Sequence, residues 1–475
     1  MRSTVRFVLP PELEAAAPPE MRGLRRDHVR LLLLDRDTGA VRHHRFDELP
    51  LLLAPGDLVV VNDSRTLPAS LLGRTTGGSA LEVRLAARAA PGGVRGTPKG
   101  CPGGSGGVRG TPGGCPGGSG GVRGTPKGCP GGTGGVRGTP RGCPGGSGGV
   151  RGTPGGCPGG TGDGGERWAA LPLGVPADGG DPALVPTDAR PAAPPLPPGE
   201  RLVFGGGLTA TVLGRHAEAP PLVWLAFDAD GERLAEALHR AGRPVRYAYV
   251  PQPWPLHHYQ TLFAAAPGSA EMASAGRPFT VQTVRALRDR GVGLATISLH
   301  AGLSTYGDPA VDRRFVPPEA YRVPEATAAA VDRCRATGGR VVAVGTTVVR
   351  ALETAAAAAG AGAGGSGGVR GTPGGCPGGS GGVRGTPGGC PGGSGGVRAG
   401  AGVTRLRIGP GHRLLAVDGL LTGLHEPEAS HLDLLGAFVD PEVLGRAYTA
   451  ALDAGYLWHE FGDVCLVLPA PGRPA

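Results

Sequence analysis

A fourteen-residue unit, GGVRGTPKGCPGGS, recurs in two blocks of this chain and constrains what those parts can fold into. Five copies occupy residues 92–161, and two copies followed by a broken third occupy residues 367–398. The unit is rich in glycine, contains two prolines and has almost no large apolar side chains, so it can neither build a core nor propagate a helix. The strict glycine period of collagen is also absent. We therefore expect two disordered low-complexity insertions.

The two blocks also change the meaning of the composition. Without them, 373 of the 475 residues remain, enough for one substantial core and a smaller domain. The formal net charge of the whole chain is +9, but the blocks hold eleven Lys and Arg residues and no acidic residue, so the remainder carries −2. The basic character therefore does not indicate a nucleic-acid-binding domain, and any patch that binds RNA must be local.

Seven of the nine cysteines lie in the repeats, fourteen residues apart within each block, which is not the spacing of paired zinc ligands. Only Cys334 and Cys465 remain, too few for a disulfide scaffold, and this favours a reducing, cytoplasmic location. The N-terminal residues lack the apolar segment of a signal peptide, and no run is long enough to cross a membrane. Because HExxH and Cys/His quartets are also absent, we expect no bound metal.

Apolar patterning predicts an α/β chain that a small β domain interrupts. Residues 30–36 and 58–61 are expected strands, and the second ends in a polar cluster, Asn62-Asp63-Ser64-Arg65, where α/β folds often bind ligands. Short alternating runs then predict an all-β domain. Its expected strands are 80–86, 201–204, 208–213 and 222–227.

Strands and helices alternate again after residue 230, which indicates an α/β domain. The expected strands are 294–299, 340–344, 414–421 and 464–468, and the expected helices are 279–290, 324–337, 348–359 and 441–454. The chain thus divides into the first part of an α/β domain (1–65), an inserted β domain (66–230, containing 92–161) and the second part of the α/β domain (231–475, containing 367–398).

Three positions at expected strand ends carry chemistry. Gly345-Thr346-Thr347 stands between a strand and a helix, so it predicts either an anion site at the helix N-terminus or an ordinary N-cap. His300 and His425 each follow an apolar strand and are either acid–base groups or structural histidines. Neither a GxGxxG nor a GxxxxGK[ST] nucleotide motif occurs at a strand end.

Seven collinear segments resemble the S-adenosylmethionine:tRNA ribosyltransferase-isomerase family of queuosine biosynthesis. Residues 30–39 resemble its "SRLLxLDRxTG", 55–69 its "PGDLLVxNDTRVIPAR", 298–306 its "TLHVGxGTF", 342–353 its "AVGTTxVRxLE", 409–411 its "YPGxxF", 422–427 its "TNFHLPxS" and 461–463 its "YGDA". The matches span 30–463 and skip only the repeats, and chance would not place seven segments in the family's order.

The sequence also departs from the family pattern. Ala273–Phe279 stands for "PTAGLHF", so Pro278 replaces a histidine, and only Glu319 remains of "HSE". Residues 249–258 lack the usual Arg and Asp, and Gly423, Leu424 and Glu426 alter the "NFHLP" segment. These changes fall in expected loops and not in core strands, so the resemblance is to a diverged member of the family.

The resemblance implies a barrel-like α/β catalytic domain with an inserted β-barrel domain. It implies an enzyme that transfers and isomerises the ribosyl part of S-adenosylmethionine onto 7-aminomethyl-7-deazaguanine in tRNA, giving epoxyqueuosine-tRNA and releasing adenine and methionine. The partners would be tRNA and S-adenosylmethionine, with no other cofactor and a monomer favoured. Two alternatives stay open: a paralogue acting on another 7-deazapurine acceptor, and a non-catalytic protein that binds RNA or S-adenosylmethionine.

The resemblance also assigns roles to individual residues by motif position. The expected acid, base and charge-stabilising groups are His300, His425, Glu353 and Asp463. The expected substrate-binding residues are Asn62, Asp63, Arg65, Tyr259, Gly302, Thr305, Tyr306, Glu319, Gly345, Thr346, Thr347 and Arg350.

Overall fold

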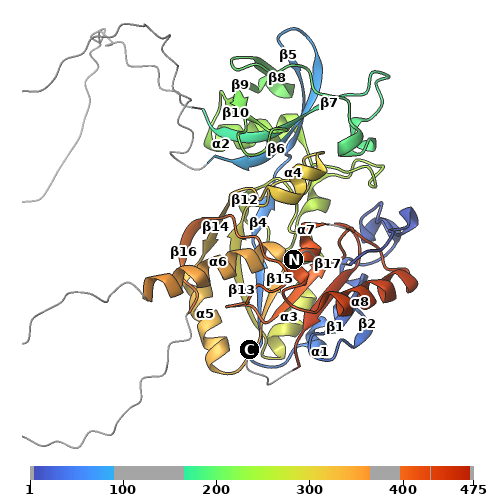
Figure 1. The fold of residues 1–475 in the computed structure, drawn as a ribbon, viewed down its shortest axis with the longest axis vertical. Helices are drawn as coiled ribbons and strands as arrows, with labels where there is room; N and C mark the ends of the chain where they lie inside the picture. The colour runs from blue at the N-terminus through green and yellow to red at the C-terminus, as the bar shows by residue number, and fades with distance from the viewer. Residues whose placement is uncertain (1–4, 90–164, 364–395, 428, 471–475) are drawn as a thin grey trace, which may run out of the picture. The chain divides into compact units, whose positions relative to one another are not determined.

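The computed structural model of the chain describes residues 5–89, 165–363, 396–427 and 429–470 (Figure 1). The two repeat blocks were predicted to be disordered. Of their residues, only 396–398 are among the described ones. For those last residues the prediction is wrong. Val397 is buried in the main core, and the backbone N–H of Arg398 donates to the carbonyl of Ala355 (3.2 Å). An apolar side chain that finds a packing partner is enough to order the end of the broken repeat.

A nine-stranded sheet organises the larger part of the fold (Figure 1). Four neighbouring strands run parallel: β13 (Gly293–Leu299), β3 (Leu58–Asn62), β15 (Val341–Val344) and β17 (Gly419–Gly423). Their carboxyl ends therefore meet at one edge of the sheet. The order is β16-β14-β13-β3-β15-β17-β18-β1-β2, where the other strands are β1 (Arg30–Asp35), β2 (Val41–Arg45), β14 (Glu319–Val323), β16 (Gly400–Thr404) and β18 (Val464–Leu468).

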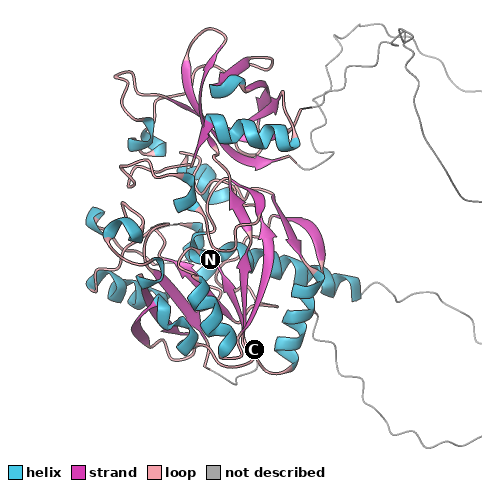
Figure 2. Ribbon diagram, turned by 180° about the vertical axis from the view of Figure 1, so that it is seen from behind, coloured by secondary structure: helices cyan, strands magenta, loops and turns pink. Residues whose placement is uncertain are grey.

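Both faces of the sheet are covered, as Figure 2 shows. The continuous apolar run of β3 serves this arrangement, because Leu58 and Val60 enter one core and Val59 and Val61 the other. The first core includes residues of α5 (Glu325–Ala336), α6 (Thr346–Ala363), α7 (Ser430–Leu435) and α8 (Pro441–Asp453), and the second includes residues of α1 (Leu49–Leu52) and α3 (Val281–Asp289).

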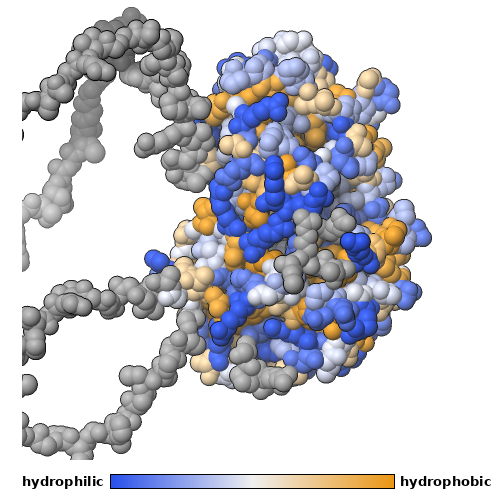
Figure 3. Space-filling view, in the orientation of Figure 1, coloured by the Kyte–Doolittle hydropathy of each residue, from blue (hydrophilic) through white to orange (hydrophobic). Residues whose placement is uncertain are grey.

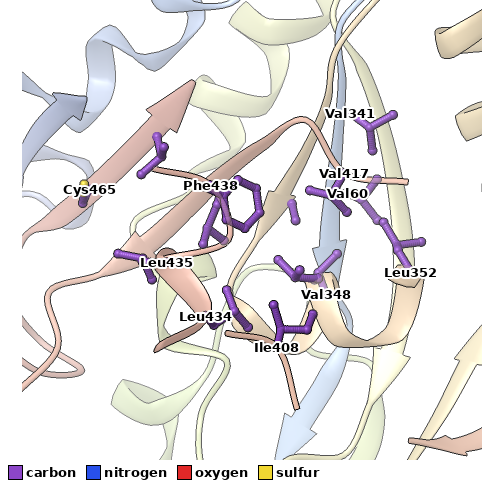
Figure 4. Packing of buried hydrophobic residues seen from close by; sticks show 14 of the residues in the cluster. Val60, Val341, Val348, Leu352, Ile408, Val417, Leu434, Leu435, Phe438 and Cys465 are labelled. Atoms are coloured by element: carbon purple, nitrogen blue, oxygen red, sulfur yellow. The ribbon is translucent and has the colours of Figure 1, made fainter. Parts of the chain in front are cut away.

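Helix α6 lies against the first of these cores. In Figure 4 Val60 lies near Val348 and Leu352, which α6 presents four residues apart on one face. Fixing α6 against β3 also fixes the N-terminus of the helix beside the carboxyl ends of the strands.

A closed six-stranded antiparallel barrel forms the second part. Its strands follow the order β5 (Ser70–Thr75), β6 (Ala80–Arg88), β7 (Arg167–Gly174), β10 (Val223–Phe227), β9 (Thr209–Arg215) and β8 (Arg201–Phe204), and the pairing of β5 with β8 closes it. Helix α2 (Gly231–Ala241) adds Leu234 and Leu238 to the barrel core, and β11 (Gly242–Arg243) pairs with β5. The prediction of an α/β fold with an inserted β-barrel is confirmed.

The first repeat block connects two strands that pair with each other. Strands β6 and β7 form an antiparallel pair, and the backbone N–H of Ala89 donates to the carbonyl of Arg167 (2.8 Å). The chain thus leaves and re-enters the barrel at one place, which is where a long connection costs least, because loop-closure entropy grows only logarithmically with length.

Most predicted elements are present, with particular exceptions. The segment 414–421 was expected to be one strand, and this is wrong, because β17 begins only at Gly419. The backbone N–H groups of residues 415–417 donate instead to the carboxylate of Glu353. Several strands were missed, among them β14 and β16 of the large sheet and the short strands β4 (Ser64–Thr66), β11 and β12 (Ala266–Ser269). Three further misses have a visible cause: β2 is polar (VRHHR), β5 contains Gly73, and β7 contains Pro172.

Polar and apolar residues are interspersed on the face in Figure 3. Exposed large apolar side chains such as Val8, Met21 and Leu51 come from separate places in the sequence. None of the helices in the described ranges combines the length and apolar content needed to cross a membrane.

A buried ion pair fixes the opposite edge of the sheet. The carboxylate of Asp57, just before β3, accepts hydrogen bonds from Arg340 Nη2 (2.5 Å) and from the backbone N–H groups of Arg340 (3.0 Å) and Ala54 (2.8 Å). Both side chains are at least 94 % buried. The pair therefore ties the start of β3 to the start of β15.

We expect Arg340→Met to lower the free energy of unfolding by about 3–5 kcal/mol, because it leaves the buried carboxylate of Asp57 without its counter-ion. Urea denaturation at pH 7 measures this. The control is Arg405→Met, which breaks an exposed pair with Glu218 and should cost less than about 1 kcal/mol. Equal losses in the two variants would contradict a structural role for the buried pair.

Candidate active site

Asn62 joins three elements at the edge where the parallel strands end. Its Oδ1 accepts hydrogen bonds from the backbone N–H groups of Leu299 and Ser64, both at 3.0 Å. Its Nδ2 donates to the carbonyl of Leu299 (2.9 Å) and to Thr347 Oγ1 (3.3 Å). One amide therefore holds the end of β3, the end of β13 and the first turn of α6 in register.

His300 lies in a chain of hydroxyl groups beside Asn62. Its Nδ1 is 2.8 Å from Ser64 Oγ, which is 2.6 Å from Ser269 Oγ, and the latter accepts from the backbone N–H of Ala301 (3.0 Å). The strand pair β4 (Ser64–Thr66) and β12 (Ala266–Ser269) brings the two serines together. Gly268 leaves room for the ring, because a Cβ there would lie 2.6 Å from Nδ1. The imidazole is thus held at Nδ1.

The protonation of His300 follows from this setting. Burial lowers the pKa of its imidazole, and the nearby carboxylate of Asp63 only partly opposes the shift. In one arrangement Ser269 donates to Ser64 and Ser64 donates to Nδ1, so the ring proton is on Nε2. In the reverse arrangement Nδ1–H donates to Ser64, and Nε2 can accept a proton.

A second group at the same edge contains unsatisfied polar atoms. Glu319 accepts from the backbone N–H of Gly302 (3.0 Å) and pairs with Arg350, whose Nε donates to the carbonyl of Leu406 (3.0 Å). Among the described residues, Arg350 Nη2 and the hydroxyl of Tyr306 are buried without a hydrogen-bond partner. Buried donors rarely stay unpaired, and a guanidinium N–H and a hydroxyl are each suited to donate to a carboxylate or phosphate group.

Two stacked histidines follow β17. The rings of His425 and His431 lie 4.5 Å apart and nearly parallel, and His425 Nε2 is 2.7 Å from Thr422 Oγ1. Burial lowers the pKa of His425 well below its usual value, with the neighbouring His431 adding to this. Burial, and then the charge of Arg350, lower the pKa of His431 to about 4. Both rings are therefore neutral at pH 7.

The loop that departs from the family pattern borders a small hollow at this edge. Pro278 and Arg277 line it together with Gly423 and His459. Arg277 is buried and donates to the carbonyl of His258 and to Glu20, so it fixes the loop. Although Pro278 has no imidazole to offer, His459 lines the same hollow, and its Nε2 and Nδ1 each lie 3.4 Å from a carboxylate oxygen, of Glu14 and Glu426 respectively.

His459 is the one non-glycine residue in the described ranges with a positive φ, 72°. Such a backbone costs on the order of 1–3 kcal/mol and needs support from its surroundings. The ring stacks on Tyr249 with 3.7 Å between centroids, and Tyr249 donates to Glu460 (2.6 Å). Burial lowers the pKa of His459 to about 4 and raises that of Glu460 to about 7.

Several predicted residues have framework positions. The carboxylate of Glu353 accepts hydrogen bonds from the three backbone N–H groups of residues 415–417, and that of Asp463 accepts from Leu457 and Arg30.

The remaining predicted binding residues have varied positions. Thr305 donates to Asp312, and Asp63 accepts from Ser298. Thr346 is buried, whereas Arg65 is exposed. Gly345, with a φ of 91°, makes the turn into α6. Tyr259 is buried at the end of a short helical turn.

The structure adds residues that the sequence did not single out. Ser64 lies inside a recognised motif, so its position was a signal that could have been used. Ser269, His431, His459 and Glu460 join the edge only through tertiary packing, and no local pattern marks them. In the described ranges, no group of three or more His, Cys, Asp and Glu side chains is arranged to hold a metal ion.

A sequence model of the family described as queuosine biosynthesis protein matches residues 2–102 and 185–467. The chain belongs to this family. The unmatched stretch between the two ranges contains most of the first repeat block. The seven segments that resemble motifs of this queuosine biosynthesis family all lie within residues 30–463.

Relatives within the queuosine biosynthesis family are similar over nearly the whole chain. The S-adenosylmethionine:tRNA ribosyltransferase-isomerase of Gloeobacter violaceus is 30 % identical over 470 residues, 98 % of this chain and 95 % of that protein. The enzyme of the same name from Sorangium cellulosum is 31 % identical over 480 residues, 97 % and 96 % of the two chains. The crystal structure of the S-adenosylmethionine tRNA ribosyltransferase of Thermotoga maritima is 23 % identical, covers 98 % and 99 % of the two chains and has a TM-score of 0.41.

The neutral histidine of α7, His431, predicts a pH dependence of stability. Because the pKa of His431 is about 4 in the fold and near 6.5 when unfolded, its contribution is full above pH 6.5 and is lost as the pH falls toward 4. His431→Gln should therefore flatten the fall of the unfolding free energy between pH 6.5 and 4, by about 1–3 kcal/mol. Urea denaturation at several pH values checks this, with exposed His239→Gln as the control. An unchanged slope would contradict it.

Proposed function

We propose that this protein catalyses the reaction of its family, in which the ribosyl part of S-adenosylmethionine is transferred to 7-aminomethyl-7-deazaguanine in tRNA and isomerised, with release of adenine and methionine. The full-length family match carries this proposal. The arrangement at the carboxyl edge of the sheet supports it, because the edge combines a half-buried imidazole, a hydroxyl chain and a guanidinium with one unpaired nitrogen.

Arg350 and Tyr306 bind the methionine carboxylate of the donor. Among the described residues at this edge, Arg350 Nη2 and the Tyr306 hydroxyl are buried without a partner, and a carboxylate accepts hydrogen bonds from groups of both kinds. Glu319 holds the guanidinium in place and leaves one of its nitrogens for the ligand. The sulfonium sulfur of the donor joins the methionine chain to the 5′ carbon. Fixing the carboxylate therefore also restrains the reacting carbon beside the histidines.

His300 moves the proton at the reacting centre. The sulfonium acidifies the adjacent 5′ carbon, so the reaction needs a base there that is neutral at pH 7, and the lowered pKa of His300 provides one. The hydroxyls of Ser64 and Ser269 hold the ring, and Ser64 can accept a hydrogen bond from Nδ1–H once Nε2 has taken a proton. Asn62 sets the distance between this base and the N-terminus of α6.

His425, stacked on His431, lies at the end of the neighbouring strand β17 and is neutral at pH 7, so it serves as a second group that can accept a proton. His459 lines the hollow that Pro278 also lines, where the family pattern has a histidine. The loop change at Pro278 is thus compatible with turnover. Neither the paralogue nor the binding-protein alternative gains a specific observation in its favour.

The experiment is adenine release from S-adenosylmethionine with tRNA that bears 7-aminomethyl-7-deazaguanine. The full chain and a chain without 92–161 and 367–395 should both release adenine, and release should depend on this tRNA. Release that needs only a free 7-deazapurine would support the paralogue alternative. No release from folded protein would overturn the proposed function and favour a binding protein.

We expect His300→Ala to lower the rate of adenine release by about 100-fold or more while leaving the affinity for S-adenosylmethionine near that of the wild type. Ser64→Ala should lower the rate less, by roughly tenfold, because it removes the support of the ring and leaves the imidazole. Single-turnover kinetics measure the rates, calorimetry the affinity, and His239→Ala is the matched control. A His300→Ala rate within threefold of the wild type would refute the role of His300.

A further inference from the structure

The loop that begins with His300 is packed against the barrel. Leu303 and Tyr306, a few residues further along this loop, are buried in the barrel core. A Cβ at Gly302 would lie 2.8 Å from the carbonyl oxygen of Ala86, so a side chain there would push β6 away. The C-terminal end of β6 therefore lies beside the candidate active site.

A β-bulge sets the position of Arg88 at this end of β6. The register between β6 and β7 shifts between Leu85 and Ala87, and the shift places Arg88 opposite Trp168. Without the shift, Arg88 would lie opposite Arg167, and two like charges would face each other. Bulges next to active sites commonly re-aim a side chain in this way.

One carboxylate holds Arg88 and leaves most of its guanidinium in solvent. The Nε of Arg88 lies 2.9 Å from Glu166 Oε1, and the two side chains are 64 % and 10 % exposed. Glu166 also accepts from Trp168 Nε1 (2.9 Å) and from the backbone N–H of Gly231 (3.3 Å), so its own position is fixed. Within the described part of the chain, no further acid pairs with Arg88, and its two terminal nitrogens are available to a ligand.

The charge of Arg88 reaches the candidate active site. Burial is the main cause of the lowered pKa of His300, the carboxylate of Asp63 opposes it, and the positive charge of Arg88 adds to it. The part of the chain outside the repeats carries a net charge of −2, so it attracts RNA only where single cations stand at the right place. Arg88 is an exposed cation at such a place.

A phosphate diester matches this arrangement. A guanidinium with two available terminal nitrogens can donate a pair of hydrogen bonds to phosphate oxygens. In RNA a phosphate is only one sugar away from each base, so a base that reaches His300 brings a phosphate toward Arg88. The donor S-adenosylmethionine has no phosphate, and its sulfonium and ammonium groups are cations that Arg88 would repel.

We propose that Arg88 binds a backbone phosphate of the RNA substrate, next to the nucleotide that is modified. This inference rests on the proposed function, because the reaction at His300 brings that nucleotide to this edge of the sheet. Arg88 lies outside the seven segments that resemble family motifs. A contact of this kind orients the RNA and carries no sequence information.

The first test measures binding of the full chain to tRNA bearing 7-aminomethyl-7-deazaguanine at several salt concentrations. We expect Arg88→Gln to weaken binding about 3- to 10-fold and to lower the slope of log affinity against log salt by roughly 1, with unchanged affinity for S-adenosylmethionine. The matched control is Arg74→Gln, which removes an exposed arginine paired with Ala80, at the other end of β6. Urea denaturation shows that both variants are folded.

The second test identifies the phosphate. One of the two phosphates that flank the modified nucleotide is replaced by an uncharged methylphosphonate, in two separate tRNA samples. At one of these positions the replacement should weaken binding to the wild type and to Arg74→Gln, and should weaken binding to Arg88→Gln no further. This coupling separates a direct contact from a structural role of Arg88.

The outcomes decide as follows. A lower affinity and a smaller salt slope in Arg88→Gln alone, together with the coupling at one phosphate, support the proposal. An Arg88→Gln variant that binds tRNA like the wild type overturns it, and so does a variant that stays as sensitive as the wild type to both methylphosphonates. Adenine release by the wild type is measured separately, and tRNA binding needs no turnover, so the proposed function and this contact can fail independently.

Discussion

The amide of Asn62 is the interaction on which the candidate site depends. It satisfies the backbone of Leu299 in both directions, turns the chain at Ser64 and reaches Thr347 at the start of α6. Three elements that are far apart in the sequence thereby keep a common register, and two of them carry chemistry. An aspartate could accept these bonds but not donate them, so only an amide serves every partner.

The parallel strands explain why that register produces a site. Strands β13, β3, β15 and β17 run in one direction, so His300, Asn62, Gly345 and His425 all emerge at the same edge. The buried pair of Asp57 and Arg340 anchors the other edge. The strands hold α6 in place at this edge. An unpaired atom such as Arg350 Nη2, which α6 carries, therefore keeps its position for a ligand.

Much of this arrangement could be predicted from the sequence because the determinants are local. The continuous apolar runs of β3 and β18 require burial on both faces, and the strand at 464–468 was predicted with its exact bounds. Strand β2 was missed because a polar edge strand has no apolar pattern. The family motifs marked Asn62, His300 and Arg350, whose roles stay proposals.

The remainder depends on contacts that no local pattern encodes. Ser269 meets Ser64 only because β12 pairs with β4, and His431 meets His425 only because α7 packs beside β17. Glu353 looked like a charge-stabilising acid in its motif, yet its carboxylate is used by the backbone of residues 415–417, which the fold alone brings near. A carboxylate that acts on substrate and one that clamps a loop look the same in a sequence.

The most direct test of the account is a crystal structure of the protein with S-adenosylmethionine bound. We expect the donor at the carboxyl edge of the sheet, with its carboxylate within hydrogen-bond distance of Arg350 Nη2 and the Tyr306 hydroxyl, and its 5′ carbon facing His300. A donor bound elsewhere, with those two polar atoms still unpaired, would contradict it.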